Sequence, residues 1–214
     1  MISGAGAICC SLGSCPDATL SLRAGDCQND ICCGLNSCWN ANFSSNGPIR
    51  SLSCEGDACR RATASSLMGD LFCNTTTGPV CQDFEGEFRD IVPAQHSITC
   101  TGRDACNRAS FTFSGAGANV SIKCDSEDSS RFGGACADTV VDVVASNVCL
   151  EVICSDKLPD TCEGMKINIH DPTSKCFYQG PAVFNPIRHF AVPALPPAQS
   201  RRRTFVALGL MVMA

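Results

Sequence analysis

Residues 54–62 read CEGDACRRA, and residues 100–109 repeat the pattern with one extra residue as CTGRDACNRA. In both stretches two cysteines enclose a short polar loop, and a small apolar residue follows three positions after the second cysteine. The pattern recurs along the chain, with second cysteines separated by 21 residues (Cys38 to Cys59) to 30 residues (Cys106 to Cys136). Self-similarity at such a period is typical of solenoid proteins, in which each repeat forms one coil.

The repeats contain seven cysteine pairs that can each close a loop. They are Cys10/Cys15, Cys33/Cys38, Cys54/Cys59, Cys73/Cys81, Cys100/Cys106, Cys124/Cys136 and Cys154/Cys162. Pairing within each loop is the favoured connectivity, and each disulfide of this size contributes roughly 2 kcal/mol in the chain-entropy model. Pairing between neighbouring coils stays open, because a sequence alone does not fix disulfide connectivity.

The segment after each second cysteine alternates between apolar and polar residues. Ala109, Phe111 and Phe113, for example, are separated by Ser110 and Thr112. A period of two with one polar side predicts a strand. A second strand is expected before each first cysteine, where an apolar residue stands two positions upstream: Leu52, Leu71, Ile98, Ile122 and Val152. Half-turns between the two strands are expected near Gly69-Asp70 and Gly115–Gly117.

One such unit cannot bury its apolar side alone, but stacked units can, with strands about 4.8 Å apart. The sequence therefore predicts an all-β protein: a single parallel β-solenoid of about seven disulfide-stapled coils, with two short strands per coil. A string of separate disulfide-rich modules is the structural alternative. We expect the solenoid over residues 1–176, a proline-rich linker over 177–200 and a basic, apolar tail over 201–214.

Five further cysteines lie outside the repeat pattern. Cys9 and Cys32 are 23 residues apart, each directly before a repeat cysteine, and we expect them to stack and form a disulfide. Cys149 has outward parity, and we expect it to pair with Cys176. Cys27 is then left over, as a free thiol, an intermolecular bridge or a sign that the chain is a fragment.

The composition favours disulfides over metal binding. Nineteen of 214 residues are cysteine, with no CxxC motif and only three histidines. A thiolate metal site is the alternative, but we expect no metal and no cofactor. The net charge is −5, and four of the sixteen basic residues lie beyond residue 180, where there is no acidic residue. Without a basic patch in the cysteine-rich part, nucleic acid is not expected as a partner.

The repeat C-x-G-x-x-A-C-x-x-A, as in residues 100–109 and, with one residue fewer, in residues 54–62, resembles the uncharacterised cysteine-rich solenoid repeats of predicted secreted and cell-surface proteins in microbial eukaryotes. The similarity covers roughly residues 9–170. It implies an extracellular location and a structural or adhesive role, and it brings no catalytic residues.

No hydrolase, metalloprotease or nucleotide-binding motif is present. Asp83, Glu85 and Glu87 are the best carboxylate cluster, and a solvated acidic face is the favoured interpretation. Polysaccharide-cleaving catalysis would need partners on neighbouring coils, where the sequence places Thr63, Ser65, Ser110 and Thr112. We therefore expect a non-catalytic structural or binding protein, serving as a rigid spacer or an adhesive surface for an unknown protein or glycan ligand. A polysaccharide-active β-helix enzyme and a thiolate metal-binding protein are the alternatives.

Three sequons identify Asn42, Asn74 and Asn119 as N-glycan acceptors if the chain is secreted. The N-terminus MISGAGAICC lacks a signal-peptide pattern, so we expect a fragment of an extracellular or cell-surface protein. Residues 201–203 are arginines followed by FVALGLMVMA, which is shorter than the roughly 20 residues that span a bilayer. A truncated membrane helix, a lipid-anchor signal and an incidental apolar tail are the three interpretations.

Overall fold

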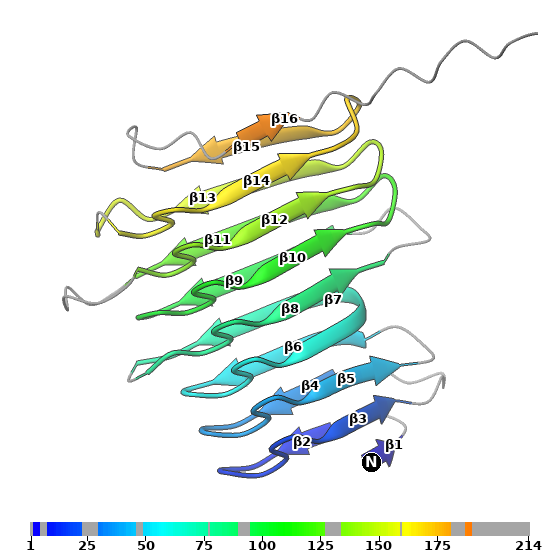
Figure 1. Ribbon diagram of the computed structural model, residues 1–214, viewed down its shortest axis with the longest axis vertical. Helices are drawn as coiled ribbons and strands as arrows, with labels where there is room; N and C mark the ends of the chain where they lie inside the picture. Colours follow the sequence, from blue (N-terminus) through cyan, green and yellow to red (C-terminus); the bar gives the residue numbers. More distant parts are fainter. Residues whose placement is uncertain are drawn as a thin grey trace, which may run out of the picture.

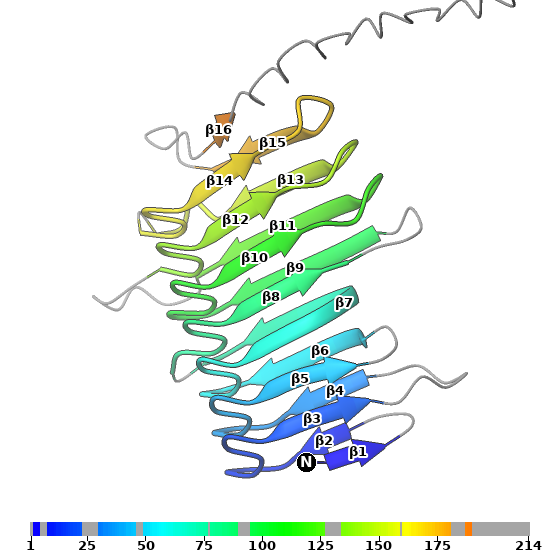
Figure 2. The same cartoon turned by 45° about the vertical axis from the view of Figure 1, so that its right-hand side comes forward.

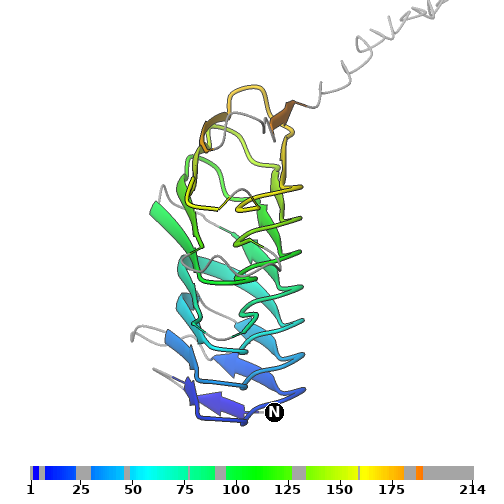
Figure 3. The same cartoon turned by 90° about the vertical axis from the view of Figure 1, so that its left-hand side faces the viewer.

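The computed structural model describes residues 2–4, 8–22, 30–45, 49–76, 78–89, 95–126, 134–158, 160–180 and 187–189. Within these ranges the chain is all-β, without a helix. It winds into a parallel β-solenoid in which the strands stack in rows (Figure 1). Seen along the sheets, two walls of strands face each other and tight loops close one edge (Figure 3).

The two walls are built from alternate strands of the chain. One wall contains β1 (Ile2–Gly4), β3 (Thr19–Leu22), β5 (Asn42–Ser45), β8 (Glu85–Phe88), β10 (Ser110–Phe113), β12 (Val140–Val143), β14 (Lys166–Ile169) and β16 (Ile187–His189). The other contains β2 (Ile8–Cys10), β4 (Asp30–Cys33), β6 (Ile49–Glu55), β9 (Gln95–Thr101), β11 (Asn119–Asp125), β13 (Cys149–Cys154) and β15 (Lys175–Gln179). The long strand β7 (Thr63–Asn74) runs through both walls.

Neighbouring strands pair in parallel, and equivalent residues of successive repeats are in register. The first cysteines of the corner loops form one such column: Cys10, Cys33, Cys54, Cys73, Cys100, Cys124 and Cys154. The parallel pairing and the alternation of buried and exposed residues confirm the predicted parallel β-solenoid and exclude a string of separate modules.

The core is a narrow apolar column between the walls. Small residues fill it near the corner loops, where Ala41, Ala62 and Ala109 are fully or almost fully buried. Larger rings fill the middle: Phe88 stacks on Phe113 with ring centroids 4.7 Å apart. Fully burying such side chains stabilises the fold by about 1.5–3 kcal/mol each. The core therefore depends on neighbouring coils, because no single coil encloses these rings.

Each corner loop is closed by a disulfide within the same coil. The seven bonds join the pairs that the sequence indicates: Cys10–Cys15, Cys33–Cys38, Cys54–Cys59, Cys73–Cys81, Cys100–Cys106, Cys124–Cys136 and Cys154–Cys162. Their Cα–Cα distances lie between 6.0 Å (Cys100–Cys106) and 6.2 Å (Cys33–Cys38), within the usual range for disulfides. None of these bonds joins neighbouring coils.

The second cysteine of every corner has a left-handed backbone conformation, with φ from 51° at Cys81 to 61° at Cys162. This conformation costs a non-glycine residue about 1–2 kcal/mol. It turns the cysteine N–H toward the preceding coil: the Cys59 N–H, for example, donates to the Ser37 carbonyl at 3.1 Å. The corner thus joins successive coils by backbone hydrogen bonds while the disulfide fixes the corner itself.

The residue two positions after the second cysteine is also left-handed and points its N–H the other way. The Asp83 N–H donates to the Asn107 carbonyl of the following coil at 3.0 Å, and the Arg108 N–H donates to the Ala137 carbonyl at 2.8 Å. Aspartate and asparagine tolerate this conformation better than most residues. Their presence at this position in four of the corners (Asp17, Asn40, Asp83 and Asp138) has this local cause.

Two expectations about the chain path need correction. The half-turn expected at Gly69-Asp70 is not a separate loop, because β7 continues through both residues as one strand while it passes from one wall to the other. Gly69 makes this path feasible, since a side-chain Cβ there would lie 1.9 Å from the Arg50 carbonyl oxygen of the neighbouring coil. The solenoid also extends beyond residue 176: β15 reaches Gln179, and β16 pairs with β14. The residues after 189 lie outside the described part.

Replacing Gly69 by alanine is expected to destabilise the protein by about 1–3 kcal/mol, because the new methyl group would meet backbone. The control is Gly34→Ala, whose Cβ would lie 3.3 Å from its nearest neighbour, the Cys10 carbonyl oxygen. Urea unfolding of both variants measures the difference. Equal stability of Gly69→Ala and Gly34→Ala would contradict the close approach of β6 and β7.

Removing a corner disulfide is expected to cost more where the closed loop is longer. The Cys124–Cys136 pair spans 12 positions and the Cys100–Cys106 pair spans 6. Each doubling of loop length adds about 0.6 kcal/mol of closure entropy. Replacing both Cys124 and Cys136 by alanine is therefore expected to lower the free energy of unfolding by about 0.6 kcal/mol more than replacing both Cys100 and Cys106. Urea unfolding without reductant makes the comparison. The reverse order would show that the unfolded-chain constraint is not the main effect.

Candidate functional site

A polar groove of about 580 Å³ lies on the outer side of the wall that contains β5, β7, β8 and β10. We call it the hydroxyl groove. It is lined by Asn42, Ser44, Thr63, Ala64, Ser65, Glu85, Gly86, Glu87, Ser110 and Thr112. The groove brings the serine and threonine hydroxyl groups together with the carboxylates of Glu85 and Glu87. The sequence assigns all of these residues to outward positions. These strands lie side by side in Figures 1 and 2.

Strand register aligns the polar side chains of the groove in a row across four strands. Asn42, Thr63, Glu85 and Ser110 are successive register partners, and Glu87 is the partner of Thr112. The β7–β8 pairing shifts between Ala64 and Leu67. Such an irregularity bends the strand. Ala64 and Gly86, which alternate with the outward residues, contribute to the floor of the groove.

The two carboxylates of the groove differ in their surroundings. Glu87 is held by Arg89, whose Nε lies 2.7 Å from Glu87 Oε1, and this carboxylate raises the pKa of the Arg89 guanidinium. Glu85 makes no side-chain hydrogen bond or ion pair with any described residue. Glu85 is therefore the carboxylate that is available to a ligand, while Glu87 is already neutralised.

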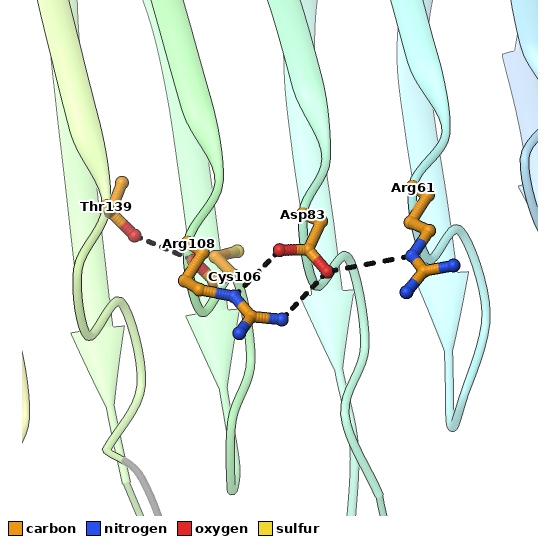
Figure 4. A network of polar contacts seen from close by, with 5 residues as sticks. All are labelled: Arg61, Asp83, Cys106, Arg108 and Thr139. Carbon is orange, nitrogen blue, oxygen red and sulfur yellow. Dashed lines mark hydrogen bonds and ion pairs between the residues drawn. The ribbon is translucent and has the colours of Figure 1, made fainter.

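A second polar array follows the corner loops along the solenoid axis (Figure 4). Arg108 donates two hydrogen bonds to the Asp83 carboxylate, one from Nε at 2.7 Å and one from a terminal guanidinium nitrogen at 2.9 Å. Arg61 approaches the same carboxylate at 3.9 Å from the other side. Asp83, which the sequence groups with Glu85 and Glu87, therefore belongs to this corner array, where it joins three successive coils.

The opposite wall has a smaller hollow of about 280 Å³ near its last strands. It is lined by Gln95, Asn119, Val120, Ser121, Cys149, Glu151 and Phe177. Phe177 is 60% exposed, and the Cys149 thiol is exposed. The sequence does not indicate this hollow, because its residues come from four strands of successive coils and are far apart in the sequence.

The two disulfides expected outside the repeat are absent: Cys9, Cys32, Cys149 and Cys176 are all free thiols. Cys9 and Cys32 are in register on adjacent parallel strands, which are about 4.8 Å apart. The Cβ atoms of a disulfide lie about 3.8 Å apart, so the strands would have to move closer.

Cys149 and Cys176 are separated for a different reason. Cys149 is the register partner of Lys175, whereas Cys176 is the partner of Leu150, so the two thiols lie on opposite faces of the sheet. Burial, with a smaller effect from Cys149, raises the pKa of the Cys176 thiol to about 12. Cys27 lies outside the described residues.

Three groups of cysteines each bring three sulfur atoms within 4.8 Å of one another, but these groups are not thiolate clusters. They are Cys33/Cys54/Cys59, Cys73/Cys100/Cys106 and Cys124/Cys154/Cys162. Each group contains one complete disulfide and one sulfur of the disulfide on the preceding coil. A metal needs deprotonated thiolates, which these oxidised sulfurs do not supply.

The three sequon asparagines are exposed. Asn42 lines the hydroxyl groove, Asn119 lines the smaller hollow, and Asn74 ends β7 beside a corner loop. Glycosylation at these sites stays a prediction.

Comparisons with protein-family models, with curated proteins and with solved structures found no match. The described residues contain no helix of the length and apolarity that a membrane span requires.

Replacing Asp83 by asparagine is expected to reduce stability by about 0.2–1 kcal/mol, since the ion pairs are exposed. Asparagine keeps the left-handed backbone accessible, so the change isolates the lost charge. Asp138→Asn, at the equivalent corner position, is the control, because Asp138 makes no ion pair within 4 Å in the described part. Thermal unfolding at low and high salt measures both. A loss at Asp83 that persists in 1 M salt would contradict the electrostatic explanation.

Proposed function

We propose that this chain is a non-catalytic extracellular or cell-surface repeat protein, a rigid spacer that carries a glycan-binding face. Disulfides in such number are typical of proteins in oxidising compartments, and they close the corners of a fold whose core is a narrow column. The resemblance of the repeat to those of predicted secreted proteins of microbial eukaryotes supports the same location. The arginine-rich tail at 201–214 is a proposed membrane attachment.

The observation that carries the binding role is the alignment of hydroxyl, amide and carboxylate groups across adjacent coils in the hydroxyl groove. Hydroxyl groups of Thr63, Ser110 and Thr112 can donate and accept hydrogen bonds, and Glu85 accepts them. A polysaccharide presents the complementary hydroxyl groups at regular intervals. The groove has no exposed aromatic or aliphatic anchor of the kind that protein interfaces use, and this favours a glycan over a protein ligand.

The strand register around Glu85 and Glu87 is the reason why we propose binding without catalysis. Glycoside hydrolysis by the usual route needs two carboxyl groups on either side of the scissile bond. Thr63 and Ser110 flank Glu85 on the neighbouring strands, and Thr112 stands beside Glu87. Glu85 and Glu87 lie on one strand, and Glu87 already forms an ion pair with Arg89.

Co-sedimentation with insoluble chitin, cellulose, β-glucan and mannan tests the proposal. We expect at least one polysaccharide to retain the protein, and we expect Glu85→Gln combined with Thr63→Val to weaken retention about tenfold or more. The matched control is Ser97→Ala combined with Thr99→Val, on the outer side of β9 in the opposite wall.

Absence of binding to every polysaccharide, or equal loss in the control variant, would contradict the groove as a glycan site. Release of soluble reducing sugar by the wild-type chain, lost in Glu85→Gln, would favour the polysaccharide-active enzyme instead.

A further inference from the structure

Cys9 and Cys32 form an exposed pair of thiols at the N-terminal end of the solenoid. They are register partners on β2 and β4, so their side chains leave the same outer face of two adjacent parallel strands. This pair differs from the corner sulfurs, which are oxidised, and from Cys149 and Cys176, which lie on opposite faces.

The spacing of the pair suits a bridging ion better than a sulfur–sulfur bond. Side chains that leave adjacent parallel strands in register start about 4.8 Å apart. A disulfide requires sulfur atoms about 2.05 Å apart and Cβ atoms at about 3.8 Å. A metal–thiolate bond of zinc measures about 2.3 Å, and two bonds of this length in line span about 4.6 Å. Two thiolates on side chains that start about 4.8 Å apart can therefore hold an ion in line between them.

Two carboxylates also lie near the pair. The carboxylates of Asp30 and Glu55 act electrostatically on Cys32. Asp30 accepts a hydrogen bond from the Ser51 hydroxyl at 2.7 Å, which holds it on the same outer face. The sequence neighbours Cys10 and Cys33 point inward and are oxidised in corner disulfides. They cannot compete as ligands, so the site offers two thiols beside two carboxylates.

We propose that Cys9 and Cys32 form a two-thiolate binding site for a soft monovalent cation, copper(I). Thiolate is the ligand that copper(I) prefers. Binding replaces each S–H bond by an S–Cu bond and releases both protons to solvent, while copper and sulfur keep their oxidation states. The site is separate from the hydroxyl groove, which lies on the other wall, so this proposal stands independently of glycan binding.

A copper(I) titration of the full chain tests the site. The protein is treated with a mild reductant that leaves the buried corner disulfides intact, and copper(I) is delivered as its complex with a chromophoric chelator under anaerobic conditions. We expect the protein to withdraw one equivalent of copper(I) from the chelator. Cys9→Ser and Cys32→Ser should each weaken this binding by a factor of 100 or more, whereas Cys149→Ser should not change it.

Three results would overturn the proposal. The first is no withdrawal of copper, and the second is withdrawal that survives both Cys9→Ser and Cys32→Ser. The third is a Cys9–Cys32 disulfide in the protein as isolated that persists under the mild reductant, found by mass spectrometry of alkylated peptides. Sulfur-edge or copper-edge X-ray absorption that reports two sulfur neighbours would support the linear two-thiolate geometry.

Discussion

The fold depends on the corner in which a disulfide and a left-handed cysteine occur together. The corner has to reverse the chain within a few residues while its backbone stays hydrogen-bonded to the coils on both sides. The left-handed conformation meets the second requirement by turning one N–H toward the preceding coil and another, two residues later, toward the following coil. The disulfide meets the first, since it keeps the corner closed where the core offers only small residues such as Ala58 and Ala105.

The register set by the corners also determines which residues become neighbours on the outer faces of the two walls. Because every corner sets the same register, outward residues of successive coils become neighbours, and any chemistry repeated in the sequence becomes a row on the surface. The row through Thr63, Glu85 and Ser110 forms the hydroxyl groove on one wall. The same rule brings Cys9 beside Cys32 on the other wall. Both candidate sites are thus consequences of stacking, and neither requires a dedicated loop.

Much of this architecture was predictable because cysteine spacing and two-residue alternation each have a direct physical meaning. The alternation of Phe111 and Phe113 with Ser110 and Thr112 indicates which side of the strand faces the core. The spacing of the corner cysteines indicates the length of each coil. The left-handed cysteines were not predictable, because no cysteine propensity indicates that conformation. Nor was the continuous path of β7 through Gly69, which depends on the approach of Arg50 from another coil. The Cys9–Cys32 disulfide was wrongly predicted, because proximity in register does not supply the shorter Cβ separation that a disulfide needs.

Tryptic mapping without reduction tests the central claim, that each corner is closed within one coil. Cleavage after Arg50 and Arg60 releases residues 51–60, SLSCEGDACR, which contain Cys54 and Cys59 and no other cysteine. A bond within the corner predicts that this peptide appears alone, two hydrogens lighter than its reduced form. Its recovery joined to a peptide containing Cys33 or Cys73, the register partners of Cys54, would contradict the account and show that the disulfides join neighbouring coils.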